Sequence, residues 1–271
     1  MSVTIGAQYL HSMLVQVTPH MGTDDTIPVI NAIHLEAGDN HLTAIATDRF
    51  TLGIARQGVI DDETWTSAIP AEDLPAVTAW AKAAEFDVVT IDTTVEDDDA
   101  TLTFKGKGGA LQISHRARDY AALPSWRKLV RDAITGTPEV VQLSGLTTKY
   151  LARWKHADKI LHFFQTGPRK PLVFMDDEGD FIGLQMPINN EHTSRSELIG
   201  QWKTSLSRRA VVNGEAYSLD VQWADKQGDP WEYTGLNRGD EPLMRLVGID
   251  DDDHTLGELI EYFGPLSPIA T

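Results

Sequence analysis

The chain has 271 residues and no cysteine, which excludes a disulfide scaffold, a thiolate metal site and a cysteine nucleophile. Its length favours two domains, and a hydrophobic fraction of 41% is sufficient for a packed core. The net charge of −17 disfavours general coating of nucleic acid, because a polyanion repels an acidic surface, although a local basic face remains possible.

The sequence has no apolar run close to the roughly 18 residues of a membrane-spanning helix. Residues 1–10 also lack the charged region and the apolar region of a signal peptide. We therefore expect a cytoplasmic protein that makes no membrane contact, in which the acidic excess serves solubility.

Residues 2–56 predict a strand, a helix and three further strands. Leu10, Met13, Leu14 and Val17 are spaced as one face of an amphipathic helix, which Pro19 ends. Glycine, aspartate and asparagine at 38–40 form a turn between strands. Strands are expected over 2–5, 28–35, 42–46 and 50–55.

The same order of elements recurs twice. The second copy has a helix that Asp73 can cap, and the third has a helix face traced by Leu146, Tyr150, Trp154 and Ala157. Strands are expected over 65–69, 88–91, 101–104, 110–115, 140–143, 160–164, 171–175 and 181–186. One copy has too few strands to cover both faces of its sheet, so copies must pair. The prediction is an α+β fold of antiparallel sheets with helices on one face.

The domain boundaries follow from composition. Residues 118–138 contain two prolines and a glycine and are predicted to link the domains. We expect one domain over 1–130, a second over 138–250 and a C-terminal acidic turn with an amphipathic helix over 251–271. The third repeat occupies 139–190. Beyond it we expect a capped helix over 194–206, strands over 211–223, 231–234 and 243–247, and a turn at Asn213-Gly214. This tail either completes the second domain or forms a separate small module.

The sequence contains no convincing catalytic motif. Residues 106–109 are rich in glycine but lie between two strands, which indicates a hairpin turn rather than a phosphate loop. The nine histidines have no metal-ligand spacing, and the acidic run 250–253 lacks the alternation of a calcium loop. Asp48 has no second titratable partner at a telling spacing. We expect neither an enzyme nor a cofactor or metal.

Basic residues gather on two of the predicted helices. Because lysine and arginine on a helix can follow a phosphate backbone, these side chains are candidate DNA contacts. An ordinary solvated helix face is the alternative. The candidates are Lys149, Arg153, Lys155, His156, Lys159, Arg195 and Lys203.

The repeats and several motifs together resemble the bacterial DNA polymerase III β sliding clamp family. Residues 26–56, TIPVINAIHLEAGDNHLTAIATDRFTLGIAR, look like the start of that family's middle domain. PSWRK at 124–128 is similar to the segment that closes it, and TTKYLARW, GPRKPLVFM and DFIGLQMPI within 139–188 look like half of its last domain. The family's first domain and the other half of its last domain have no counterpart here, and the final 80 residues do not look like a clamp.

The resemblance implies a DNA-clamp fold whose members are not enzymes but encircle DNA and tether polymerases and other partners. It also implies a pocket for partner peptides where the middle and last domains meet. Its walls would be Thr47, Asp48, Arg49, Phe50 and Leu52 on one side and Met186, Pro187 and Ile188 on the other.

Two functional hypotheses are therefore preferred over an enzymatic function. The first is a homo-oligomeric clamp-like protein that binds double-stranded DNA and the peptide motifs of replication or repair proteins. The second is a clamp-derived interaction module that does not encircle DNA; it is favoured by the net charge and by a second predicted helix with Lys82 as its one basic residue.

Overall fold

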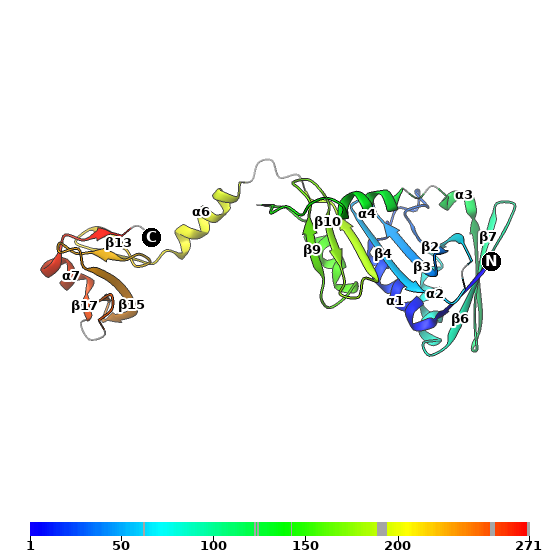
Figure 1. Cartoon of the computed structure of the whole chain (residues 1–271), viewed down its shortest axis with the longest axis horizontal. Helices are drawn as coiled ribbons and strands as arrows, with labels where there is room; N and C mark the ends of the chain where they lie inside the picture. The colour runs from blue at the N-terminus through cyan, green and yellow to red at the C-terminus, as the bar shows by residue number, and fades with distance from the viewer. Residues whose placement is uncertain are drawn as a thin grey trace. The chain divides into compact units, whose positions relative to one another are not determined.

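The computed structural model describes residues 1–61, 63–121, 123, 125–141, 143–188, 194–249 and 253–269. The chain divides into two compact units, Met1–Glu191 and His192–Thr271, each with its own hydrophobic core. Figure 1 shows the elements of both units, which are described separately below.

The first unit contains the three repeats and the segment predicted to link them. Its strands are β1 (Ser2–Gly6), β2 (Ala32–Gly38), β3 (His41–Thr47), β4 (Thr51–Gly58), β5 (Trp65–Pro70), β6 (Val88–Glu96), β7 (Asp99–Gly106), β8 (Gly109–Arg116), β9 (His162–Gln165), β10 (Leu172–Met175) and β11 (Phe181–Gln185). Its helices are α1 (Ala7–Val17), η1 (Thr18–His20), α2 (Leu74–Ala83), α3 (Ala117–Tyr120), α4 (Trp126–Ile134), α5 (Thr148–Leu151) and η2 (Ala152–His156), where η marks a 3₁₀ helix.

The strands form two antiparallel sheets, ordered β1-β6-β7-β8 and β5-β2-β3-β4-β11-β10-β9. The first two repeats exchange their opening strands, because β1 pairs with β6 of the second repeat and β5 pairs with β2 of the first. Strand β11 then pairs with β4, which adds the third repeat to the same sheet. The α+β prediction is confirmed, and the expected pairing of repeats occurs through the exchanged strands β1 and β5 and through the pairing of β4 with β11.

The core lies between the sheets and the helices α1 and α2. Leu10, Met13, Leu14 and Val17 of α1 are buried, as their spacing predicts. They pack in one cluster with buried side chains of β2 that include Leu35. Burial of side chains of this size contributes about 1.5–3 kcal/mol each, so this face holds the helix on the sheet.

The segment 118–138 is not a free linker. It contains α3 and α4, and α4 buries Val130 and Ala133 against Ile45 and Ile54, on the sheet face opposite to α1 (Figure 1). The Trp126 Nε1–H donates to Glu36 Oε1 at 3.0 Å. With β4 paired to β11, the sheet is continuous across this segment, so the expected boundary at 130–138 falls inside one compact unit.

Four local predictions need correction. Strand β2 begins at Ala32 rather than residue 28, because backbone bonds such as Asn31 N to Pro28 O close a turn there. Asp73 precedes α2 without a side-chain cap bond. Residues 140, 141 and 143 are not in a strand, and Val140 is 98% exposed. The third predicted helix is one α-helical turn, α5, continued by the 3₁₀ helix η2.

The second unit is a small sheet module. It contains α6 (Arg195–Leu206), β12 (Arg209–Val212), β13 (Glu215–Ser218), β14 (Trp223–Ala224), β15 (Pro230–Arg238), β16 (Glu241–Leu246), β17 (Asp253–Thr255), α7 (Leu256–Phe263) and β18 (Ser267–Pro268). β12 and β13 form a hairpin across the predicted turn at 213–214, and the sheet order is β17-β16-β15-β14-β18. The expected strand over 211–223 is thus divided among β12, β13 and β14.

The core of this unit contains Trp223, Trp231, Met244, Leu256 and Leu259. Of the two alternatives for the tail, a separate compact unit is the one observed. The expected acidic turn at 250–253 lies mostly outside the described residues.

Candidate functional site

An apolar groove of about 420 Å³ lies where the β3–β4 turn, the end of β11 and α4 meet. Its lining includes Ile30, Phe50, Leu52, Trp126 and Met186. Phe50 is 53% exposed and Met186 is 44% exposed, so large apolar side chains border open space at this point. Such a hollow suits a ligand with hydrophobic groups.

The groove brings together five of the eight predicted pocket residues: Thr47, Arg49, Phe50, Leu52 and Met186. Asp48 is not part of the lining and belongs to the polar network described next. Pro187 and Ile188 are also outside the lining, and the Ile188 N–H donates to Gly145 O at 2.8 Å.

Sequence analysis missed the wall supplied by α4 and the 27–30 loop. Trp126 and Leu129 line the groove from α4, while Val130 and Ala133 are buried against the sheet. Their helical spacing is a signal that could have revealed this helix, had 118–138 not been interpreted as a linker from its prolines and glycine.

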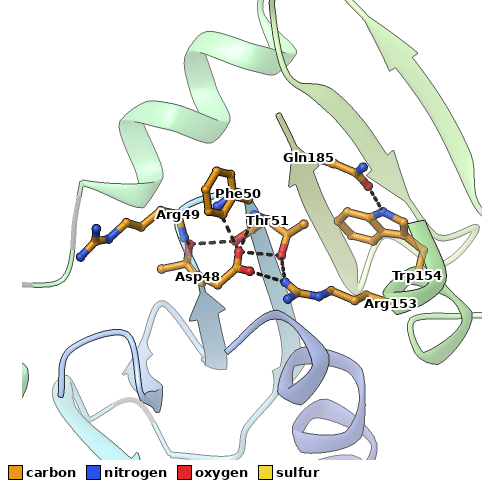
Figure 2. A network of polar contacts seen from close by, with 8 residues as sticks. Asp48, Arg49, Phe50, Thr51, Arg153, Trp154 and Gln185 are labelled. Atoms are coloured by element: carbon orange, nitrogen blue, oxygen red, sulfur yellow. Dashed lines mark hydrogen bonds and ion pairs between the residues drawn. The ribbon is translucent and has the colours of Figure 1, made fainter. Parts of the chain in front are cut away.

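The turn that carries Phe50 is held by its own side chains. Asp48 Oδ1 accepts from the backbone N–H of Phe50 at 3.0 Å and of Thr51 at 2.8 Å. Thr47 Oγ1 accepts from the Arg49 N–H at 3.1 Å and donates to Thr51 O at 2.8 Å. Arg49 has φ of 77°, a left-handed conformation that the surrounding bonds must stabilise. Figure 2 shows the Arg49 side chain pointing away from this network.

Arg153 of η2 reaches the same turn from the third repeat. Its Nη1 lies 2.7 Å from Asp48 Oδ2 and donates to Thr51 Oγ1 at 2.6 Å (Figure 2). The Arg153 side chain is 14% exposed and the Asp48 side chain 12%, so this ion pair is largely shielded from water. The guanidinium predicted as a DNA contact is therefore engaged inside the chain.

Next to Arg153, Trp154 anchors η2 on the sheet. Its ring stacks on Phe174 with centroids 4.1 Å apart, and its Nε1–H donates to Gln185 Oε1 at 2.6 Å. The ring lies over Gly183, which pairs with Gly53 across β11 and β4. A Cβ at Gly183 would come within 2.1 Å of the Trp154 ring, so the close approach requires glycine.

His20 fills the matching hollow over Gly53. It is fully buried, its ring lies 4.5 Å from that of Trp154, and neither ring nitrogen has a hydrogen-bond partner among the described residues. Burial, reinforced by the Arg153 charge and partly opposed by Asp48, lowers the His20 pKa to about 3. His20 is consequently neutral at physiological pH and acts as part of the packing.

No family model matches the sequence, and no curated protein matches it either. Solved structures do: the Caulobacter crescentus β sliding clamp with bound PEG aligns at a TM-score of 0.54 with 13% identity, covering 94% of this chain and 83% of that one. The Helicobacter pylori β clamp bound to a DNA ligase peptide aligns at 0.51 with 11% identity, covering 73% and 69%.

The Bacillus subtilis sliding clamp aligns at a TM-score of 0.51 with 12% identity, covering 70% of this chain. The chain has the sliding-clamp fold. It spans 64% of the Bacillus subtilis protein, so the clamp fold is present here over a shorter length. At these identities the likeness establishes the architecture alone.

Within this clamp fold, the predicted DNA contacts separate into different environments. Lys149, Lys155, His156 and Lys159 are exposed around α5 and η2, unlike Arg153. Arg195 and Lys203 are exposed on α6 of the second unit. Helices α1 and α2 together contribute one lysine, Lys82, and no arginine.

In the described ranges, no group of three or more histidines and carboxylates is placed to hold a metal ion. None of the helices in those ranges has the length and apolar character needed to cross a membrane.

Proposed function

We propose that this chain is a non-enzymatic, clamp-like protein that holds an extended peptide segment of a protein partner in the groove bordered by Phe50, Leu52 and Met186. The groove itself carries the proposal, because exposed apolar walls with a few polar groups suit a peptide that inserts hydrophobic side chains. Its place at the β4–β11 junction matches the pocket that the family resemblance implies.

Two proteins with this fold suggest the class of partner. The Helicobacter pylori clamp was solved with a DNA ligase peptide, and a Pseudomonas aeruginosa sliding clamp, 15% identical to this chain, was solved with griselimycin. Peptide segments of replication or repair proteins are the partners proposed for this chain by analogy.

Direct binding tests the proposal. The DNA ligase peptide and griselimycin are titrated into the full chain by calorimetry, and then into Phe50→Ala and Met186→Ala. Both side chains are substantially exposed, so these variants should fold. Truncation of an anchor at a small apolar site costs about 1–3 kcal/mol, which is a 5- to 150-fold loss of affinity.

Phe86→Ala is the matched control, because Phe86 is 91% exposed and lies outside the groove lining. Its affinity should equal that of the unaltered chain. The proposal fails if neither probe binds, or if Phe50→Ala binds as tightly as Phe86→Ala.

A second candidate function is tethering to double-stranded DNA as a homo-oligomer. The exposed lysines 149, 155 and 159 on one short segment favour it, since clustered lysines bind phosphates. The scarcity of basic residues on α1 and α2 and the charge of −17 oppose it. Several copies would be needed to enclose a duplex.

Duplex affinity measured against salt concentration tests this candidate. Replacing the three lysines by glutamine should weaken binding and reduce the log–log salt slope by about 1 for each phosphate that is no longer neutralised. Light scattering with and without duplex gives the number of copies. A mass of one chain at every concentration, together with no salt-sensitive DNA binding, would refute this candidate. The remaining function would then be an interaction module that does not bind DNA.

A further inference from the structure

We propose that Arg153 is a positioning residue of the groove: from η2 it fixes the Asp48–Thr51 turn and thereby sets where Phe50 and Met186 stand in the groove wall. Its effect on ligand affinity rests on the proposed function, whereas its effect on the wall does not.

The first route from Arg153 to the groove runs through one carboxylate. Asp48 Oδ1 is occupied by the backbone N–H groups of Phe50 and Thr51, and Asp48 Oδ2 faces Arg153 Nη1 at 2.7 Å. Both oxygens are therefore used, one to shape the turn and one to attach it to η2. Charge-assisted contacts of this length are among the stronger hydrogen bonds in proteins.

A second route runs through aromatic rings. The Arg153 guanidinium lies 4.6 Å from the centre of the Tyr150 ring, and Tyr150 stacks on Phe50 with centroids 5.4 Å apart and planes inclined by 17°. Arg153 thus orders the ring against which Phe50 rests. The Phe50 carbonyl in turn accepts from the Met186 N–H at 2.9 Å. A displacement of the turn would therefore also displace Met186 in the opposite wall of the groove.

The segment that carries Arg153 is itself fixed to the sheet. Trp154, the next residue, is buried over Gly183 and bonded to Gln185 Oε1 (Figure 2). A guanidinium on a fixed backbone can hold a turn in place, whereas one on a mobile segment would move with it. This explains why a basic residue in the middle of a lysine-rich segment faces inward.

The proposal separates positioning from stability. Arg153→Leu alone leaves Asp48 charged and shielded without its partner, which destabilises the fold for reasons unrelated to the groove. Adding Asp48→Asn removes that charge, while the attachment to η2 stays broken. The double variant should therefore regain much of the lost stability and keep the altered groove.

Methionine methyl signals report on the groove without a ligand. The chain has six methionines, and Met186 borders the groove, while Met13 and Met244 are buried in the two cores and serve as references. NMR spectra of methyl-labelled protein are compared for the unaltered chain, Arg153→Leu, Asp48→Asn/Arg153→Leu and the control Lys107→Gln. Lys107 lies in the exposed turn between β7 and β8. Its replacement by glutamine removes one positive charge, as Arg153→Leu does.

We expect the Met186 signal to shift or broaden in both Arg153 variants and to stay unchanged in the control, with the Met13 and Met244 signals unchanged throughout. Griselimycin affinity should fall at least 10-fold in the double variant. An unmoved Met186 signal in the folded double variant overturns the proposal, even if griselimycin binds. A moved signal in a chain that binds neither griselimycin nor the ligase peptide supports Arg153 positioning and refutes the proposed function.

Discussion

Replacing Gly183 by alanine tests the hollow that anchors η2. The new Cβ would lie 2.1 Å from Trp154 Cζ3 and 3.2 Å from the Leu52 carbonyl oxygen, so the indole must move. Overpacking of this kind costs about 1–3 kcal/mol. Displacing the ring also breaks its bond to Gln185, which leaves buried polar atoms unpaired at about 1–3 kcal/mol. We expect a loss of about 2–6 kcal/mol in the free energy of unfolding.

Urea denaturation followed by circular dichroism measures this loss, and hydrogen exchange of β4 and β11 peptides locates it. Gly58→Ala is the control: Gly58 is on β4, the strand that pairs with β11, and a Cβ there meets no atom within 4 Å. Its stability should change by no more than about 0.5 kcal/mol. Peptides of the second unit should exchange at the same rate in all variants.

A second substitution separates steric conflict from other causes. Trp154→Phe removes the larger ring, so combining it with Gly183→Ala should cost less than the sum of the two single changes. Additive costs, or a Gly183→Ala variant as stable as Gly58→Ala, would refute the argument that the glycine exists to admit the indole.

Substitutions at three further positions probe the packing around the groove and in the second unit. His20 has a pKa of about 3 in the folded chain, whereas its ordinary value is 6.5. Between these two pH values the unfolded chain binds a proton on His20 that the folded chain does not bind. Stability therefore falls as pH drops from about 6.5 toward 3. His20→Leu should reduce this slope by up to about 1.4 kcal/mol per pH unit, measured by urea titrations at several pH values, and an unchanged slope would contradict the assignment. Trp126→Phe should lower the free energy of unfolding, measured in urea, by about 1 kcal/mol, because Glu36 loses the Trp126 Nε1–H donor. It should also speed hydrogen exchange in α4. Unchanged exchange in α4 would argue that this hydrogen bond does not hold the helix on the sheet. Thr255→Ala should lower the thermal midpoint, because the loss of the Thr255 side-chain cap on α7 costs about 1 kcal/mol of stability. Thr255→Ser retains a capping hydroxyl and should have the midpoint of the unaltered chain. Equal midpoints for the two variants would show that the cap does not contribute to stability.

The sequence by itself determined the order of strand, helix and three strands in the first two repeats, and the last three strands of the third repeat. The burial of Leu10, Met13, Leu14 and Val17 follows from a spacing that depends on neighbours within three turns. The hairpin turns at 38–40, 106–109 and 213–214 are likewise set by residues that tolerate their local backbone. Such signals are readable because the interacting residues are close along the chain.

The tertiary structure alone decided which strands pair and which charges face inward. The exchange of β1 and β5 between repeats, the position of α4 over the second face and the inward turn of Arg153 all depend on residues distant in sequence. Arg153 has the same charge and nearly the same position as the exposed Lys149 and Lys155, so composition cannot separate them. What separates them is the Asp48 carboxylate, which the pairing of β4 with β11 brings to the same end of the sheet.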